Sequence, residues 1–334
     1  MSAEGRIDMP QSGAAAQTPQ ERTLSGRLLP WLQSAGLPIA LVALVLFFSI
    51  KSDLFLTAQN LRNVGLQAAA LAAVSCGQMI VILTSGLDLS VGATVALVSV
   101  ITALAINHFG VAAGILCGIA TGVAIGVING ILITWFRVFP FIATLAMMSV
   151  LSGLALSLSG GTPVTGLPPE FTLLAYSRIG GVPIPLIVSV TVLVLAFLFL
   201  RYLRLGRYMY AVGGNRLAAI LSGLNVSAVI ITAYAMCSAC AAVGAIILSA
   251  RVGSGQPSLG GSLPLESVAA VVLGGVSLFG GRGSVFQVAV GVAFVSILSN
   301  GLNLLNVSSY TQMMVVGATL IVAVTFDQRF VARV

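Results

Sequence analysis

The chain has 334 residues, of which 58% are hydrophobic and 7% are charged, whereas an ordinary soluble domain carries roughly 25% charged residues. A water-soluble protein of this length could not bury so much apolar surface, so that class is excluded. The net charge of +7 does not indicate a nucleic-acid partner, because the basic residues are scattered between apolar runs. The composition predicts an all-α polytopic membrane protein, and its 37 glycines suit helices that pack closely in a bilayer.

Apolar runs that are long enough to cross a bilayer recur along the chain. A spanning helix takes about 20 residues, and the runs predict ten such helices, near residues 28–50, 64–84, 89–107, 111–134, 140–159, 183–200, 227–250, 265–280, 285–304 and 310–326. They form a transmembrane domain over 28–326. A polar N-terminal tail (1–27), which we expect to be disordered, and a short C-terminal tail (327–334) flank it. The first apolar run starts too late and is too long for a signal peptide.

The basic residues predict the orientation, because cytoplasmic loops carry the excess of positive charge. With the N-terminus in the cytoplasm, eleven basic residues fall in inner segments and four in outer segments. The inner set is Arg6, Arg22, Arg27, Arg137, Arg201, Arg204, Arg207, Arg216, Arg282, Arg329 and Arg333, and the outer set is Lys51, Arg62, Arg178 and Arg251. An even number of spans then places both termini in the cytoplasm.

Two short patterns recur at nearly the same separation along the chain. Asn129-Gly130 returns as Asn300-Gly301, and Ser85-Gly86 returns as Ser254-Gly255. Either these matches arise by chance in a chain rich in Gly, Ala and Leu, or spans two to five and seven to ten are related halves. Five spans per half would give the halves opposite orientations, which is common among transporters. We expect two inverted-topology halves.

The stretch Thr84-Ser-Gly-Leu-Asp-Leu-Ser-Val-Gly92 differs from an ordinary lipid-facing helix. An aspartate at the edge of an apolar span is costly unless it faces protein, water or a helix N-terminus. Asp88 or Ser90 is therefore expected to cap the helix that follows, by accepting hydrogen bonds from its free N–H groups.

Two further stretches are rich in glycine. Residues 253–261 contain too much Gly and Pro to be helical, and they are expected to form an outer-face loop that holds Gln256 and precedes Glu266. Residues 280–284 are expected to form a tight turn at the inner face, with Arg282 as its one charged residue.

The longest charged loop, residues 201–226, is predicted to be cytoplasmic. Asn215 is a good N-cap, and strong helix formers follow it, so a short helix lying on the cytoplasmic face is expected. The alternative is an ordinary surface turn. The residues assigned to the candidate coupling site here are Gly213, Gly214, Asn215, Arg216, Ala218, Ala219 and Ser222.

Three stretches together resemble one family. Ile82–Gly92, Tyr210–Gly223 (Tyr-Ala-Val-Gly-Gly-Asn-Arg-Leu-Ala-Ala-Ile-Leu-Ser-Gly) and Ala269–Ser284 (Ala-Ala-Val-Val-Leu-Gly-Gly-Val-Ser-Leu-Phe-Gly-Gly-Arg-Gly-Ser) are similar to motifs of the membrane permeases of ribose/xylose/arabinose/galactose-type ABC importers. The resemblance covers roughly residues 37–326, in the family's order. It implies a bacterial inner-membrane protein whose second motif is a cytoplasmic coupling loop.

The resemblance also implies partners. Two permease chains, identical or paralogous, would form the pathway, a cytoplasmic ABC ATPase would use ATP and Mg²⁺, and a periplasmic solute-binding protein would deliver the sugar. The sequence itself agrees that this chain is no ATPase and needs no cofactor, because a phosphate-binding loop requires G-x-x-x-x-G-K-[ST]. The only lysine, Lys51, follows no glycine-rich run. The resemblance does not specify which monosaccharide or related polyol is carried.

A pathway for a neutral, hydroxyl-rich solute requires uncharged hydrogen-bonding side chains inside the bundle. At 100° per residue, Gln67, Gln78 and Ser85 fall within about 20° of one another on span two, and span nine offers a similar row. Each residue either lines the pathway or bonds one helix to another. The candidates for pathway or gate are Gln67, Gln78, Ser85, Asp88, Ser90, Asn129, Ser296, Asn300, Asn303 and Gln312.

Two other classes compete with an ATP-driven importer. A secondary transporter driven by an ion gradient usually carries intramembrane acids, His or Lys as relays, and here only Asp88, Glu266 and His108 lie near the membrane, at span ends. A membrane-embedded enzyme is disfavoured, because a single histidine excludes an H-E-x-x-H zinc site and no G-x-S-x-G turn occurs. No catalytic residue and no metal ligand is predicted.

Overall fold

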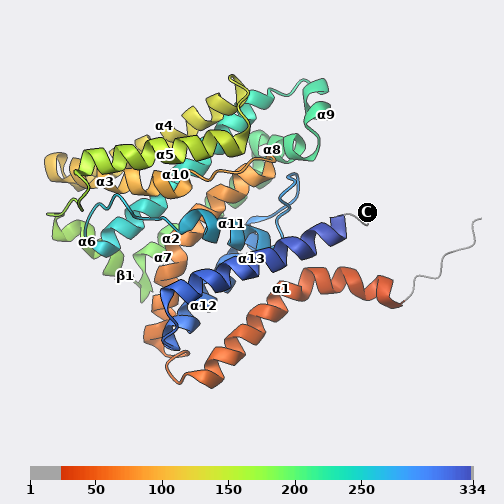
Figure 1. Cartoon of the computed structure of the whole chain (residues 1–334), viewed down its shortest axis with the longest axis horizontal. Coiled ribbons are helices and arrows are strands. Elements are labelled where there is room, and N and C mark those ends of the chain that lie inside the picture. The colour runs from red at the N-terminus through yellow and green to blue at the C-terminus, as the bar shows by residue number, and fades with distance from the viewer. Residues whose placement is uncertain (1–23, 332–334) are drawn as a thin grey trace, which may run out of the picture. The chain divides into compact units, whose positions relative to one another are not determined.

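The computed structural model describes residues 24–331, and it describes side chains for residues 36–321 and for Thr325. The chain divides into two units, Met1–Gly36 and Leu37–Val334, and the second unit contains the helical bundle (Figure 1). Residues 1–23, most of the tail that we expected to be disordered, lie outside the described residues, as do residues 332–334.

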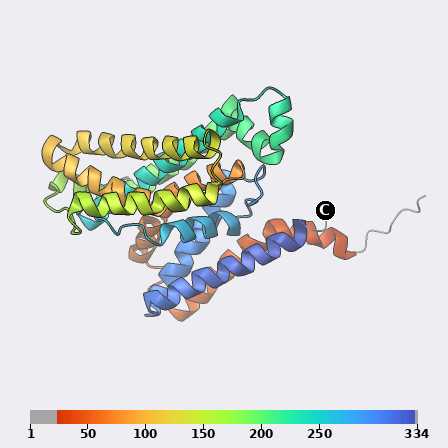
Figure 2. The ribbon, with the colours of Figure 1, turned by 45° about the horizontal axis from the view of Figure 1, so that its top comes forward.

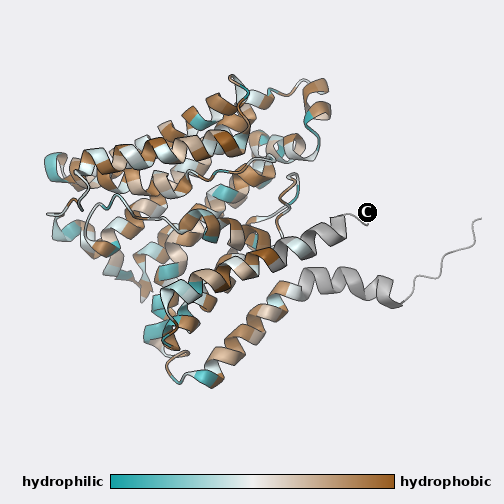
Figure 3. Ribbon diagram, in the orientation of Figure 1, coloured by the Kyte–Doolittle hydropathy of each residue, from teal (hydrophilic) through white to brown (hydrophobic). Residues whose placement is uncertain are grey.

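In the described part of the chain, nine helices correspond to predicted transmembrane spans. They are α1 (Leu24–Lys51), α2 (Ala58–Leu83), α3 (Val91–Phe109), α4 (Val111–Thr134), α5 (Pro140–Ser159), α7 (Ile184–Tyr202), α10 (Val226–Val252), α12 (Val285–Leu304) and α13 (Ser309–Val331). Over the residues described, seven of these are long and apolar enough to cross a membrane. Hydrophobic residues cover most of the helix bodies, and many hydrophilic ones gather near helix ends (Figure 3). The predicted all-α membrane fold is confirmed.

The predicted span at 265–280 is wrong as a continuous helix, although the chain still passes from the end of α10, beside the start of α2, to Gly281, beside the end of α2. Helix α11 runs only from Leu263 to Leu273, and eleven residues rise about 16 Å, roughly half of a hydrocarbon core. The chain turns after α11 at Gly274-Gly275, where Gly275 has a φ of +92°, a conformation that favours glycine. The run at 275–280 is therefore a turn in which only Val276 is buried, and not the second half of a membrane helix.

Some elements between the spans were not predicted. Helix α6 (Pro169–Tyr176) and the two-stranded hairpin of β1 (Arg178–Ile179) and β2 (Val182–Pro183) connect α5 to α7. Helix α8 (Arg204–Gly214) occupies the first half of the expected cytoplasmic loop, and helix α9 (Arg216–Leu221) follows it. The short helix expected after Asn215 is thus present, but it is the second of two.

Helix α2 lies at the centre of the bundle, and α10 crosses it in the opposite direction. Every residue of α2 from Ala69 to Leu83 is buried, which marks a helix surrounded by protein. A Cβ atom at Gly77 would meet the backbone of Cys237, whereas a Cβ atom at Gly244 would meet Val74. Positions later in α2 therefore face positions earlier in α10. This antiparallel crossing is the arrangement that inverted halves require.

The ends of equivalent helices in the two halves are separated along the chain by the same number of residues as the sequence repeat. Helix α2 ends at Leu83 and α10 at Val252, while α5 begins at Pro140 and α13 at Ser309. Both pairs of helix ends are separated along the chain by the same distance as Ser85 and Ser254. The segments α2–α5 and α10–α13 thus follow the same order, with a non-helical segment before the second helix of each.

A run of glycines lets α4 approach both of its neighbours. Gly114, Gly118, Gly122, Gly126 and Gly130 recur every four residues. A Cβ atom at the first two would overlap α3, and one at the last three would overlap the backbone or side chains of α10. Small residues at this spacing allow membrane helices to pack backbone to backbone. Helices α3, α4 and α5 lie side by side in both views (Figures 1 and 2).

The glycine-rich segment between α10 and α11 does not stay at one surface. A Cβ atom at Gly255 would overlap Ala103 and Ser99 of α3, and the carbonyl oxygen of Gly260 lies against Gly92 at the start of that helix. The segment therefore runs back along about 16 Å of α3. Irregular backbone at membrane depth is tolerated where it is covered by protein or lines a water-filled space. The expected outer-face loop is in fact re-entrant.

Candidate functional site

The turn between α2 and α3 contains the first group of predicted residues. Helix α2 ends at Leu83, and Ser85 has a φ of +61°, so the chain reverses there in a conformation that is uncommon for residues other than glycine. Ser85 therefore does not continue the helical face of Gln67 and Gln78, and that part of the prediction is wrong. Its hydroxyl group lies 3.2 Å from the carbonyl oxygen of Gly213 and 2.8 Å from that of Phe279.

The end of α2 meets the end of α8 and the 279–283 turn in direct backbone contact. The N–H group of Gly281 donates to the carbonyl oxygen of Leu83 at 3.0 Å. A Cβ atom at Gly213 would overlap that same carbonyl oxygen, and a Cβ atom at Gly280 would overlap the hydroxyl group of Ser85. We call the meeting of residues 83–85, 213–214 and 279–283 the three-way junction.

Helix α8 is also anchored to this junction by a side chain. The hydroxyl group of Tyr210 donates to the carbonyl oxygen of Gly283 at 2.9 Å. Its ring is half-buried, and this burial raises the pKa of the phenol above its usual value, so Tyr210 keeps its proton as a hydrogen-bond donor at neutral pH. Both backbone and side-chain contacts therefore join α8 to the 279–283 turn.

Asp88 and Ser90 form a fully buried polar cluster with Asn129 of α4. One carboxylate oxygen of Asp88 accepts hydrogen bonds from the backbone N–H group of Ser90 at 2.9 Å and from its hydroxyl group at 2.6 Å. The side-chain amide of Asn129 donates to the Ser90 hydroxyl group at 2.9 Å.

The capping role predicted for this cluster needs correction. Ser90 is the N-cap of α3, yet its side chain makes no capping hydrogen bond. Asp88 accepts from the N–H group of the cap residue itself and not from the helix. The pair closes the turn that precedes α3 and ties it to α4.

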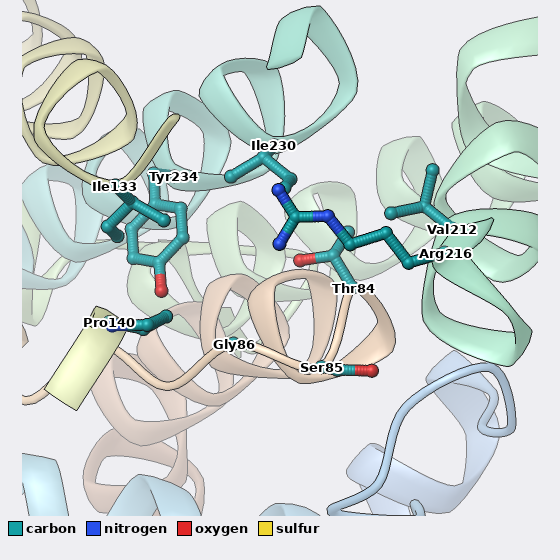
Figure 4. Close-up of a pocket in the computed structure, with 9 residues that line it drawn as sticks. All are labelled: Thr84, Ser85, Gly86, Ile133, Pro140, Val212, Arg216, Ile230 and Tyr234. Carbon is teal, nitrogen blue, oxygen red and sulfur yellow. The ribbon is translucent and has the colours of Figure 1, made fainter. Parts of the chain in front are cut away.

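A small cavity opens beside the junction (Figure 4). It has a volume of about 90 Å³ and is lined by Thr84, Ser85, Gly86, Ile133, Pro140, Val212, Arg216, Ile230 and Tyr234. Arg216 extends from α9 toward Thr84 and Ile230 (Figure 4). The hydroxyl group of Tyr234, a residue that we did not predict, donates to the carbonyl oxygen of Leu87 at 3.3 Å.

Five predicted pathway or gate residues carry buried polar atoms without a hydrogen-bond partner among the described residues. These atoms are Oε1 of Gln67, Nε2 of Gln78, Oδ2 of Asp88, Oδ1 of Asn129 and the hydroxyl group of Ser296. The other side-chain polar atom of Gln78, Oε1, lies 3.9 Å from the sulfur of Cys237. Buried polar atoms of this kind are rare, because each costs about 1–3 kcal/mol. Protein encloses all five atoms in this structure.

The other predicted amides bond helix to helix. Asn300 of α12 and Asn60 of α2 exchange two hydrogen bonds, of 2.9 and 3.0 Å, in a buried pair. Gln312 of α13 donates to the side chain of Asn303 at 2.8 Å and to the carbonyl oxygen of Val307 at 2.9 Å. Asn60 was missed because only its pairing with Asn300, which lies far away along the chain, distinguishes it from other amides near span ends.

Helix α9 presents a surface that differs from the one expected. The side chain of Asn215 accepts a hydrogen bond from the N–H group of Ala218 at 2.9 Å, so the predicted N-cap is confirmed. Ala218 and Ser222 are exposed, but Ala219 is buried against the bundle and does not contribute to an outer face. The exposed positions of α9 also include three large apolar side chains, those of Leu217, Ile220 and Leu221.

Gln256 is held by the re-entrant segment and its neighbours. Its N–H group donates to the hydroxyl group of Ser99 at 2.9 Å, and the same oxygen accepts a hydrogen bond from Ser249 of α10 at 2.9 Å. The side-chain amide of Gln256 donates to Ser254 at 3.2 Å. Glu266 lies in the first turn of α11, where a negative charge is favoured by the helix dipole.

The comparisons with known proteins bear directly on this arrangement. Residues 60–324 match the protein family described as "Branched-chain amino acid transport system / permease component". The chain is 40% identical over 316 residues to the ribose import permease protein RbsC of Escherichia coli (strain K12), an alignment covering 92% of this chain and 98% of that protein.

Two other relatives are similar over nearly the same length. RbsC of Bacillus subtilis (strain 168) is 41% identical over 301 residues, covering 89% of this chain and 94% of the relative. The D-allose transport system permease protein AlsC of Escherichia coli (strain K12) is 33% identical over 294 residues, covering 87% and 90%. No solved structure matches the chain. The helical membrane bundle, the buried turn before α3 and these relatives together establish that the chain belongs to this family of transport-system permeases.

Proposed function

We propose that this chain forms one half of the translocation pathway of an ATP-driven importer in a bacterial inner membrane, and that the solute is a monosaccharide. A second permease chain completes the pathway. A separate ATPase binds at the α8–α9 end, and a solute-binding protein binds at the opposite end. The eleven-to-four distribution of basic residues supports a cytoplasmic location for α8, α9 and both termini.

The observation that carries this proposal is the three-way junction. An ATPase can change the state of a membrane pathway only through a contact whose free energy differs between states. Helix α9 offers an exposed apolar face for that contact, and α8 connects it to the backbone of Leu83 at the end of the central helix α2. A displacement of α8–α9 must move the end of α2 or break the junction, because the backbones touch without intervening side chains.

The class of solute follows from the polar groups and the relatives. Apart from one carboxylate oxygen of Asp88, the unpartnered atoms of the predicted pathway residues belong to the uncharged side chains of Gln67, Gln78, Asn129 and Ser296, which suit hydroxyl groups better than a charged solute. The relatives are named for ribose and allose import, and a further relative, AraH of Escherichia coli (strain K12), is named for L-arabinose. Since the family description names branched-chain amino acids, leucine is the natural competitor to test.

The experiment is uptake of labelled ribose by vesicles that contain this chain with its partner ATPase and solute-binding protein. ATP-dependent uptake that unlabelled pentoses reduce, and that leucine leaves unchanged, is the expected result. Omission of the ATPase should abolish uptake. Uptake driven by a proton or sodium gradient without ATPase would favour a secondary transporter. Competition by leucine alone would overturn the sugar assignment.

A pair of matched variants tests the docking surface. Leu221 of α9 and Ile179 of the β1–β2 hairpin are 80% and 64% exposed. Leu221→Glu is expected to abolish stimulation of the ATPase, because docking would bury an unpaired charge. Ile179→Glu makes the same change in charge away from α8–α9 and should leave that stimulation intact. If Leu221→Glu supports uptake at the unmodified rate, the ATPase contact lies elsewhere, and the turn around Arg282 is the next candidate.

A further inference from the structure

A second cleft lies beside the first, between the ends of α4, α5 and α10. Its volume is about 440 Å³, and it is lined by Ile133, Thr134, Arg137, Val138, Phe139, Pro140, Arg216 and Ser227. The lining combines two guanidinium groups with hydroxyl groups and apolar side chains. The residues that line this cleft have no role in the proposed transport function, except that Arg216 belongs to α9.

The two arginines are uncompensated. Neither Arg137 nor Arg216 has a carboxylate within ion-pair distance or a side-chain hydrogen-bond partner among the residues whose side chains are described. Ser227, in the first turn of α10, adds a hydroxyl group at the helix end whose dipole favours anions. Arg137 itself has a φ of +56°, a backbone conformation that costs energy for a residue with a side chain. The site therefore favours an anion by geometry and charge.

The surroundings of the cleft are those of a membrane interface. Trp135, Phe136 and Phe139, in the loop between α4 and α5, are 69%, 70% and 67% exposed. Aromatic residues gather at the level of lipid headgroups, where one part of the ring is apolar and another is wet. An anion that enters the cleft between these rings would have an apolar environment beside it. The acyl chains of a lipid can pack against these apolar side chains, whereas a soluble anion has no apolar part that could do so.

From these contacts we infer that the cleft binds the phosphate group of an anionic phospholipid. Arg137 and Arg216 hold the phosphate, Ser227 donates to it, and the acyl chains lie against Ile133, Phe139 and the neighbouring aromatic rings. Basic pockets between membrane helices are known to hold lipid headgroups in this way. Because Arg216 begins α9, a lipid in this cleft also contacts the helix proposed to receive the ATPase.

The fluorescence of a tryptophan beside the cleft can report contact with lipid. It has two tryptophans, Trp31 and Trp135, so the Trp31→Phe variant carries a single tryptophan beside Arg137. Bromine atoms on lipid acyl chains quench tryptophan fluorescence at contact. We would measure quenching of Trp135 in phosphatidylcholine vesicles that contain increasing fractions of either brominated phosphatidylglycerol or brominated phosphatidylcholine, with the full chain and no partner protein.

The expected result is a preference for phosphatidylglycerol of at least tenfold, since each charged hydrogen bond between a guanidinium group and the lipid phosphate contributes roughly a fivefold factor. Arg137→Gln and Arg216→Gln should each lower that preference about fivefold, and Arg137→Lys should largely keep it. Arg201→Gln removes an exposed arginine that does not line the cleft, and it should leave the preference unchanged.

Three results would overturn the proposal. A ratio near one in the unmodified chain would mean that the arginines await an acidic group of a partner protein. An equal loss in Arg201→Gln would mean that the preference is a diffuse effect of surface charge. Abolition of the preference by millimolar inorganic phosphate at constant ionic strength would mean that the ligand is a soluble phosphate and not a lipid.

Discussion

The two segments that precede the second helix of each half differ sharply. The turn at 84–90 before α3 is short, and its Asp88 and Ser90 are completely buried and bonded to α4. The segment at 253–262 before α11 is longer, partly exposed, and re-enters the bundle along α3. These two segments occupy equivalent positions in the repeat. We call residues 84–90 the locked turn, because Asp88 and Ser90 are buried and hydrogen-bonded there, and residues 253–262 the open strap, because this segment is longer and partly exposed.

This difference assigns different tasks to the two segments under the proposed function. The 84–90 turn lies in the three-way junction with α8, where backbone touches backbone, so it is suited to transmit force. The 253–262 segment is held by a hydrogen bond that the N–H group of Gln256 donates to Ser99 and by a bridge in which the N–H groups and carbonyl oxygens of Val164 and Gly255 pair at 2.7 and 2.9 Å. Gly255 and Gly260 also pack against α3. Under the proposed function the segment is suited to admit or release a solute when these contacts separate.

The largest effect is expected from a methyl group placed in the junction. Gly213→Ala forces a Cβ atom onto the carbonyl oxygen of Leu83, and overpacking of this kind typically costs about 1–3 kcal/mol. Thermal unfolding should show that loss, and ATP-driven uptake should fall steeply. Gly214→Ala is the matched control, because nothing lies within 4 Å of the added atom. If both variants behave alike, the junction transmits no force.

Asp88 gives the next largest effect. Asp88→Leu leaves the N–H and hydroxyl groups of Ser90 without their acceptor in a fully buried site, which costs about 1–3 kcal/mol. Asp88→Asn keeps that acceptor, and it replaces the second carboxylate oxygen, which has no partner among the described residues, by an amide. It should be neutral in unfolding and in uptake. Equal and complete loss of uptake in both variants would instead indicate an essential charge, as in an ion-coupled carrier.

Much of the helical framework could be predicted from the sequence, because lipid-exposed and buried membrane helices both require long apolar runs. The failure at 274–280 comes from backbone conformation. These residues are apolar enough to continue α11, but the Gly274-Gly275 turn, where Gly275 has a positive φ, and the packing of Val276 end the helix. Hydropathy records apolar composition and does not distinguish an apolar turn from a helix.

The site was only partly predictable for a related reason. The motifs located Asp88, Asn215 and the glycines of the junction, because turns and caps have local signatures. Helical periodicity placed Ser85 on the face of Gln67, which is wrong because α2 ends before it. Ala219 was assigned to the coupling site with its neighbours, but its side chain is buried. The pairing of Asn300 and the contact of Gly213 with Leu83 each join segments that lie far apart in the sequence, and no local pattern records such contacts.

The smallest effect is expected in the 253–262 segment. The Ser99 hydroxyl oxygen accepts from the N–H group of Gln256 and from Ser249, so Ser99→Ala should cost about 1 kcal/mol. Because the loss is local, it should appear as faster labelling of a cysteine at position 256 while ATPase coupling stays intact. Ser75→Ala is the control, since that buried hydroxyl group has no partner among the described residues and its removal should not destabilise the fold. If Ser99→Ala instead uncouples the ATPase as Gly213→Ala does, the two segments act as one unit, and the contrast between a locked turn and an open strap is wrong.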